Sequence, residues 1–170
     1  STSLEHGAQN YWKQRVQVMD INPLFRLDGK TVLVTGASSG IGKHCATFLA
    51  QLGAKLAIAS RRIDKLQSVV EDIAQLGGQA KAFELDVTNQ KSVMKCFDEL
   101  AHWSLPTIVI NNAGMSVNRK LLEQTEEDWD RVIDTNLKGC WLVATEAARR
   151  LAARSVRNRA RRARASCPAS

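Results

Sequence analysis

The residues of this sequence best suited to bind phosphate form a glycine-rich turn, Thr-Gly-Ala-Ser-Ser-Gly-Ile-Gly at residues 35–42. The turn follows a β-branched apolar run and precedes apolar residues at helical spacing. Amides at a helix N-terminus lack partners within the helix, and the helix dipole favours negative charge there. Gly36 would permit the tight turn, Gly40 a close approach of ligand, and Gly42 close packing of helix on strand. The turn therefore predicts a pyrophosphate site, with contacts expected from Gly36, Ser38, Ser39, Gly40, Ile41 and Gly42.

A second candidate group stands at the end of the next apolar run, where the sequence reads Ala59-Ser60-Arg61-Arg62. A site for NAD would place Asp or Glu about 20 residues past the turn, to bond the free ribose 2′-hydroxyl. Here Ser60 stands in that position and Arg61 follows it. An arginine fork matches a phosphate, which a carboxylate would repel. We therefore expect Ser60 and Arg61 to favour NADP, with NAD the weaker cofactor. The alternative is that Arg61 and Arg62 only begin a solvent-exposed helix.

Alternating strands and helices must position these residues. Short apolar runs are separated by segments whose apolar residues recur at helical spacing, a pattern typical of a parallel sheet with helices on both faces. Right-handed crossovers then make the sheet doubly wound. The predicted strands are residues 31–35, 55–59, 80–85 and 107–110, and the predicted helices are residues 41–52, 63–73, 93–100 and 129–144. The fold class is α/β with only four strands, fewer than the usual six.

Four spaced motifs resemble the short-chain dehydrogenase/reductase family, in its main NAD(P)-dependent branch. The glycine turn matches the family's Thr-Gly-x-x-x-Gly-x-Gly element, and residues 111–114 match its Asn-Asn-Ala-Gly element. Asp86-Val87 follows the third predicted strand, where the family contacts the adenine ring. Residues 134–139 look like the family's helix that carries a functional Asn, here Asn136. The resemblance runs from about Phe25 to Leu151 and implies a Rossmann fold. It also implies that the cofactor is contacted by Asp86, Val87, Asn112, Ala113 and Gly114, and that Asn136 belongs to the catalytic set.

Each of these residues has a purely structural alternative. Asn111 could tie neighbouring strands together, Gly114 could be a loop hinge, and Asp86 could cap a helix N-terminus. Asn136 has low helix propensity, and either a functional role or a bond to the backbone would explain it. Trp129 and Trp141 indicate packing in the core or at an interface.

The family's Tyr-x-x-x-Lys pair and its upstream Ser have no counterpart here. The one tyrosine, Tyr11, precedes the first strand. The resemblance implies hydride transfer between the nicotinamide and a small-molecule carbonyl or secondary alcohol. Without the acid–base pair, we expect the chain as written to be inactive, a fragment carrying the cofactor-binding part. The alternative function is a catalytically inactive dinucleotide-binding or interaction module.

The net charge of +7 is unevenly distributed. Residues 149–164 hold eight Arg and no acid, whereas the first 148 residues hold 16 basic and 17 acidic residues. We expect an N-terminal extension (1–28), an incomplete NAD(P)-binding domain (29–151) and an Arg-rich tail (152–170). The tail is expected to be disordered or a frameshift artefact. A basic tail that binds nucleic acid is the third hypothesis, because clustered arginine attracts phosphate, but we expect no such partner.

Composition limits the remaining possibilities. With 44% hydrophobic and 24% charged residues, the chain is typical of a globular protein. It has no apolar run of 18 residues, so no membrane span is expected. The four cysteines form no Cys-x-x-Cys pair, so we expect a cytoplasmic protein without a metal site. The family resemblance implies that the complete protein forms a homo-oligomer.

Overall fold

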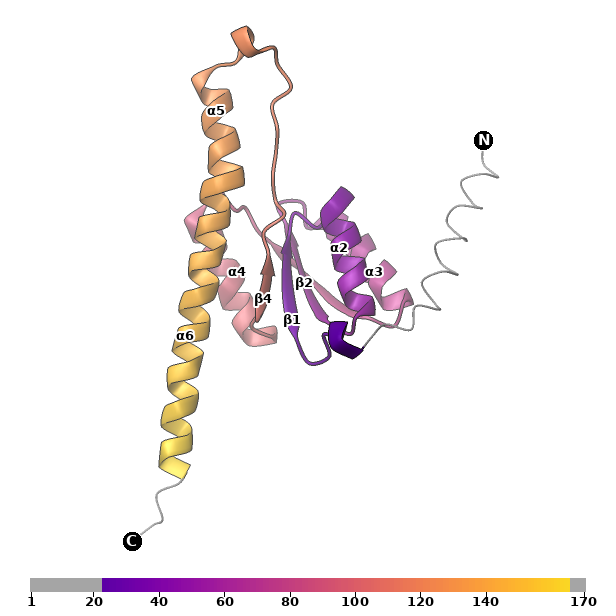
Figure 1. The fold of residues 1–170 in the computed structure, drawn as a ribbon, viewed down its shortest axis with the longest axis vertical. Helices are drawn as coiled ribbons and strands as arrows, with labels where there is room; N and C mark the ends of the chain where they lie inside the picture. The colour runs from indigo at the N-terminus through magenta and orange to yellow at the C-terminus, as the bar shows by residue number, and fades with distance from the viewer. Residues whose placement is uncertain (1–22, 166–170) are drawn as a thin grey trace, which may run out of the picture.

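A single four-stranded parallel sheet, with strand order β3-β2-β1-β4, organises the protein (Figure 1). The computed structural model describes residues 23–165. The strands are β1 (Thr31–Thr35), β2 (Lys55–Ser60), β3 (Gln79–Glu84) and β4 (Ile108–Ile110). They agree with the sequence prediction to within a residue at every end, and they confirm the α/β doubly wound class.

Helices cover both faces of the sheet. On one face, α2 (Gly40–Gln51) and α3 (Asp64–Gln75) pack against alternate strand residues such as Val32 and Ile58. On the other face, α4 (Gln90–Trp103) and α6 (Gly139–Ala165) cover Leu33 and Phe83. Successive residues of β1 therefore point into two different cores, as the pleat of a strand requires.

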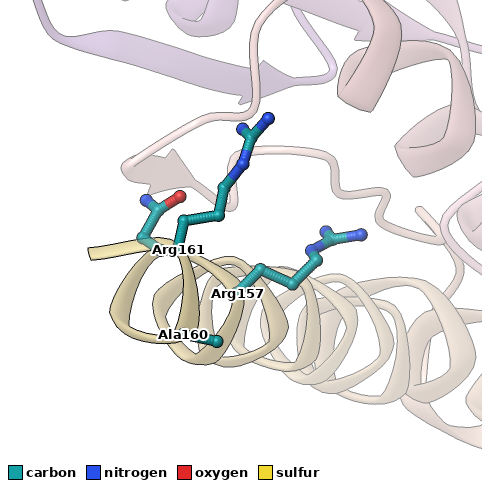
Figure 2. A pocket seen from close by; sticks show the side chains of 4 residues that line it. Arg157, Ala160 and Arg161 are labelled. Carbon is teal, nitrogen blue, oxygen red and sulfur yellow. The ribbon is translucent and has the colours of Figure 1, made fainter. Parts of the chain in front are cut away.

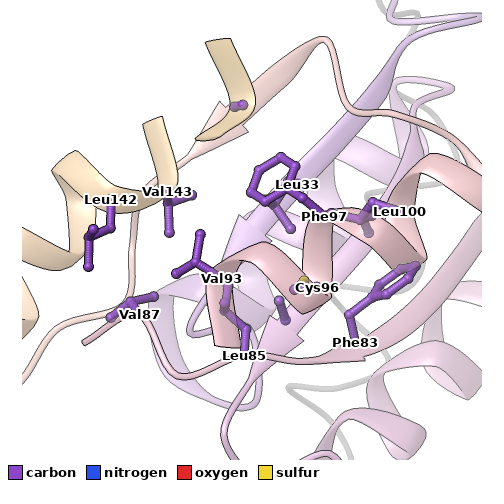
Figure 3. Packing of buried hydrophobic residues seen from close by; sticks show 13 residues of the cluster. Leu33, Phe83, Leu85, Val87, Val93, Cys96, Phe97, Leu100, Leu142 and Val143 are labelled. Atoms are coloured by element: carbon purple, nitrogen blue, oxygen red, sulfur yellow. The ribbon is translucent and has the colours of Figure 1, made fainter. Parts of the chain in front are cut away.

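The second core joins the sheet to α6. Phe97 of α4 is fully buried, and Figure 3 shows it beside Leu33 of β1. Leu142 and Val143 bring α6 into the same cluster, near Val87 and Val93. Burying a side chain of this size contributes about 1.5–3 kcal/mol. This contact holds the start of α6 against the carboxyl edge of the sheet.

The last helical region is divided, whereas the sequence predicts one helix over 129–144. A helix α5 (Glu126–Ile133) is followed by a π-helical turn η3 (Asp134–Lys138), and only then by α6. Helix α5 begins at a capping box, in which Thr125 Oγ1 accepts from the Asp128 amide and the Asp128 carboxylate accepts from the Thr125 amide. The π turn places an extra residue in the helix where Asn136 stands.

Helix α6 continues far past the predicted domain boundary at residue 151. The expectation of a disordered tail is therefore wrong for residues 152–165, which are helical. Alanine and arginine dominate this segment, and both have high helix propensity. Residues 166–170, like residues 1–22 of the N-terminal extension, lie outside the described residues. The remaining elements are two short 3₁₀ turns, η1 (Pro23–Phe25) and η2 (Leu121–Glu123).

Candidate dinucleotide-binding site

The glycine turn joins the carboxyl end of β1 to the N-terminus of α2. Gly36 has φ +66°, and a Cβ at this position would lie 2.8 Å from the Ala113 Cα. A Cβ on Gly42 would collide with the Asn112 Nδ2 and the Gly36 carbonyl oxygen. Gly36 must therefore be glycine because of its left-handed backbone conformation and its close approach to Ala113, as the sequence predicts for a tight turn. Gly42 must be glycine because a Cβ there would have no space.

The outer side of the same turn is open. Gly40 has φ +54°, and a Cβ there would meet no atom within 4 Å. Ser39 is the N-cap residue of α2, but its side chain does not cap the helix, and Ser38 beside it is half-buried. The Ile41 side chain is 76% exposed. The first turn of α2 thus lacks the side-chain cap that often satisfies helix amides, which leaves room for an anion.

Thr35 connects the glycine turn to the end of β4. Its Oγ1 accepts hydrogen bonds from the backbone amides of Asn112 and Ala113, both at 3.0 Å. The Asn112 Nδ2 donates in return to the backbone oxygens of Thr35, at 3.0 Å, and Gly36, at 3.3 Å. Sequence reasoning missed Thr35 as a site residue, although it opens the motif.

The tie between neighbouring strands is made by Asn112 rather than by Asn111. The Asn111 Nδ2 donates instead to the Cys140 backbone oxygen at 3.4 Å, and so connects β4 to α6. The alternative that Asn111 ties neighbouring strands together is therefore wrong, because its side chain bonds helix α6 instead. Adjacent side chains along an extended chain point in opposite directions, and Asn112 is the one that faces β1.

Ser60 and Arg61 lie where β2 leaves the sheet. Ser60 is 9% exposed, and its hydroxyl donates to the Arg62 backbone oxygen at 3.1 Å. The Arg61 and Arg62 side chains are exposed, and neither has an ion-pair or hydrogen-bond partner among residues 23–165. Helix α3 begins only at Asp64, so the two arginines precede the helix rather than begin it. The Ser60 bond orders the turn that presents Arg61.

Asp86 forms a local turn after β3 and does not cap α4. Its Oδ1 accepts from the Thr88 amide at 3.0 Å and from the Thr88 hydroxyl at 2.7 Å. Asn89 is the N-cap of α4 and accepts from two amides of the first turn. Val87 is buried, and a Cβ on Gly139 would lie 2.7 Å from its Cγ2. The capping alternative for Asp86 is therefore wrong.

Asn136 binds the backbone of the loop after β4. Its Oδ1 accepts from the Met115 amide at 2.8 Å, and its Nδ2 donates to the Met115 oxygen at 2.9 Å. The Cys140 thiol donates to the Asn136 backbone oxygen at 3.1 Å. A Cβ on Gly114 would lie 3.3 Å from the Asn136 Oδ1, which is a tight contact. The low-propensity residue in the helix is thus explained by a two-point bond to the loop.

These groups share the carboxyl edge of the sheet, at the point where the chain changes sides. Helices α2 and α3 cover one face, whereas α4 and α6 cover the other, so the connections that follow the neighbouring strands β1 and β4 run to opposite faces of the sheet. Such a switch point is where open α/β sheets bind their ligands. The sequence-predicted residues near Gly36, Ser60, Asp86 and Asn112 all follow strands at this edge.

Other chemistries find little support in the part of the chain that the structure describes. It contains no group of three His, Cys, Asp or Glu side chains placed to hold a metal. Burial raises the pKa of the Cys96 thiol from its ordinary value near 9 to about 12, so this buried cysteine stays protonated and is a poor nucleophile. Tyr11 lies outside the described residues. None of the helices within residues 23–165 is both long and apolar enough to cross a membrane.

Comparison with known proteins decides the family. A family model described as short chain dehydrogenase matches residues 30–158, which is more than half of the chain. The chain belongs to the short-chain dehydrogenase family. The family's known binding mode is consistent with a nicotinamide dinucleotide, NAD or NADP, at this edge of the sheet.

Individual relatives agree with this assignment. Elsinochrome reductase 1 of Elsinoe fawcettii is 41% identical over 128 residues, which cover 74% of this chain and 48% of that protein. The hydroxynaphthalene reductase-like protein Arp2 of Metarhizium anisopliae is 42% identical over 123 residues, covering 71% and 46%. A crystal structure of a short-chain type dehydrogenase/reductase from Mycobacterium marinum superposes with TM-score 0.71 at 39% identity, covering 75% and 52%. The chain thus spans about half the length of the curated relatives it matches.

Proposed function

We propose that this chain is the cofactor-binding part of an NADP-dependent oxidoreductase. In that role the cofactor exchanges a hydride with the carbonyl or secondary alcohol of a small molecule, and the protein orients it. The observation that carries the preference for NADP is the turn after β2, where a buried Ser60 replaces the acid and presents an unpaired Arg61. A carboxylate at this position would bond the free 2′-hydroxyl of NAD and repel a 2′-phosphate.

The rest of the site fits the same cofactor. The open first turn of α2 would hold the pyrophosphate, because Gly36 and Gly40 leave backbone at the surface without side chains in the way. Asp86 and Val87 would border the adenine, while Asn112, Ala113 and Gly114 would form the floor of the crevice. Asn136 would act as a positioning residue, since it holds the loop after Gly114 through Met115.

Without the family's tyrosine and lysine pair, we propose that the chain as written binds the cofactor without turning substrate over. A general acid–base partner typically contributes 10²–10⁴-fold to the rate. The same observation favours the second candidate function, a dinucleotide-binding or interaction module without catalysis. The two candidates share the site, and only the presence of hydride transfer to a ketone distinguishes them.

The complete protein would be a homo-oligomer that uses the outer side of α5 and α6. Trp129, Leu137 and Trp141 are each more than 60% exposed, so these large apolar side chains lie outside the core. A second copy of the chain would cover them.

Cys45, Cys96 and Cys140 are all unpaired, which supports a reducing, cytoplasmic location for the protein.

The cofactor preference is tested by titrating the chain with NADP and with NAD. A charge-assisted hydrogen bond contributes about 1.5–3 kcal/mol, which corresponds to roughly ten- to a hundredfold in affinity. Arg61→Ala should remove most of the preference for NADP and leave NAD binding nearly unchanged. Arg62→Ala is the matched control, since it removes the same charge one residue away. Equal affinities in the parent chain, or equal effects of the two variants, would contradict the proposal.

A further inference from the structure

The C-terminal part of α6 extends beyond the sheet as a helical arm, which we define as residues 152–165 (Figure 1). Ala147 is the last α6 residue within the described core cluster. One turn later, Arg150 donates to Asp98 of α4 at 2.7 Å and to Glu146 of its own helix at 2.6 Å. From residue 152 to residue 162 every side chain is exposed. The arm therefore starts at a fixed ion-pair network and then continues into solvent.

The arm presents arginines at helical spacing. Arg154, Arg157 and Arg161 are three and four residues apart, and this spacing places them on one side of an α-helix. Figure 2 shows the Arg157 and Arg161 side chains leaving the helix on the same side, with Ala160 on another. Arg157, Asn158, Ala160 and Arg161 all belong to this one helix, and among residues 23–165 no second element lines the space beside them. They therefore form part of an extended surface and not a small-molecule pocket.

This arginine stripe (Arg154, Arg157 and Arg161) pairs with no carboxylate among residues 23–165. Glu146 is the last acidic residue of the sequence, and Arg149 and Arg150 already pair with it. Like charges three or four residues apart destabilise a helix. A partner with closely spaced negative charges would remove that repulsion and would therefore stabilise the arm when it binds.

We propose that the arm binds the phosphate backbone of nucleic acid, without reading the bases. Duplex DNA carries one negative charge per about 1.7 Å of its axis, and arginine forks suit phosphate better than lysine does. An anionic bilayer fits less well, because an interfacial helix needs large apolar side chains on its other face. Between the arginines the arm has small or polar residues and a single larger apolar one, Val156. The helical structure of the arm supports this proposal, because Arg154, Arg157 and Arg161 lie on one side only when the arm is a helix.

The test is fluorescence anisotropy of a labelled 20-base-pair duplex of mixed sequence, titrated with the full chain between 50 and 200 mM salt. The double variant Arg157→Gln/Arg161→Gln removes two charges from the stripe. Arg159→Gln/Arg162→Gln is the matched control, since it removes two charges from other sides of the same arm. Far-UV circular dichroism checks that both variants keep their helix content.

The stripe variant should weaken binding roughly tenfold or more at 100 mM salt, and should flatten the slope of log K against log salt by about 1.8, which is two phosphate contacts. The control variant should lose less than half as much. Equal losses in the two variants, or no binding by the parent chain, would overturn the proposal. Phosphatidylserine vesicles that bind the parent chain with the same dependence on Arg157 and Arg161 would overturn it too, in favour of a membrane surface.

Discussion

Replacing Thr35 by valine tests the hydrogen bonds that hold the edge of the site together. The Thr35 Oγ1 is an acceptor for two backbone amides at 3.0 Å, and the residue is 1% exposed. Valine has nearly the same shape, so no cavity forms, but the Ala113 amide loses its partner. The Asn112 amide keeps its bond to the Ile110 backbone oxygen at 3.1 Å. A buried donor left unsatisfied costs about 1–3 kcal/mol. Because one amide is left unsatisfied, we expect Thr35→Val to lower the free energy of unfolding by about 1–3 kcal/mol.

Urea unfolding of the parent chain and the variant measures this difference, with Thr47→Val as the matched control. The Thr47 hydroxyl only donates to the Lys43 carbonyl of its own helix, at 3.0 Å, so its loss leaves no amide unpaired. The control should therefore change stability by less than about 1 kcal/mol. Amide hydrogen exchange should also accelerate at residue 113 in Thr35→Val alone. Equal destabilisation by the two variants would refute the reasoning.

Two further predictions follow from packing and from burial. Gly42→Ala should destabilise the chain by about 1–3 kcal/mol and abolish cofactor binding, because the new Cβ collides with the Asn112 side chain; thermal melts and NADP titration measure both effects, and an unchanged melt would contradict the packing argument. Burial raises the pKa of Cys96 to about 12, so the folded state holds this proton more tightly than the unfolded state does. Stability from this group is complete below pH 9, the thiol's unfolded pKa, and is lost between pH 9 and 12. Cys96→Ala should therefore reduce the decline in stability over that range, and equal declines in both proteins would show that the thiol is not responsible.

Local patterns in the sequence predicted most of the fold. The strands were predictable because a short apolar run is itself a local signal of a strand. The glycine turn was predictable because the residues that need glycine lie within a few positions of one another. The tight turn at Gly36 follows the same logic and is confirmed by its positive φ. Gly42 is closely packed as well, but against the Asn112 side chain and the Gly36 backbone rather than against a strand. The site's position at one sheet edge also followed, because parallel strands must end together.

The interactions that join distant segments were not predictable in this way. Thr35 and Asn112 are separated by 77 residues, and nothing local indicates which of two adjacent asparagines faces the turn. The π turn includes Asn136, whose side chain bonds Met115 in a loop 21 residues earlier, a contact that exists only in the folded chain. The arm differs for another reason: its abrupt change to arginine and alanine suggested a disordered or frameshifted tail, but both residues have high helix propensity and continue a helix already started by the core.

We propose that NADP binds at the carboxyl edge of this sheet through the glycine turn and Arg61. Amide chemical shifts of the isotope-labelled chain, followed during titration with NADP, test it most directly, because the arginine arm offers a competing anion site on the same molecule. We expect saturable shifts clustered at residues 36–42, 60–61, 86–87 and 112–114, with the residues of the arm unaffected at moderate salt. Shifts confined to residues 152–165, or none at the glycine turn, would contradict it.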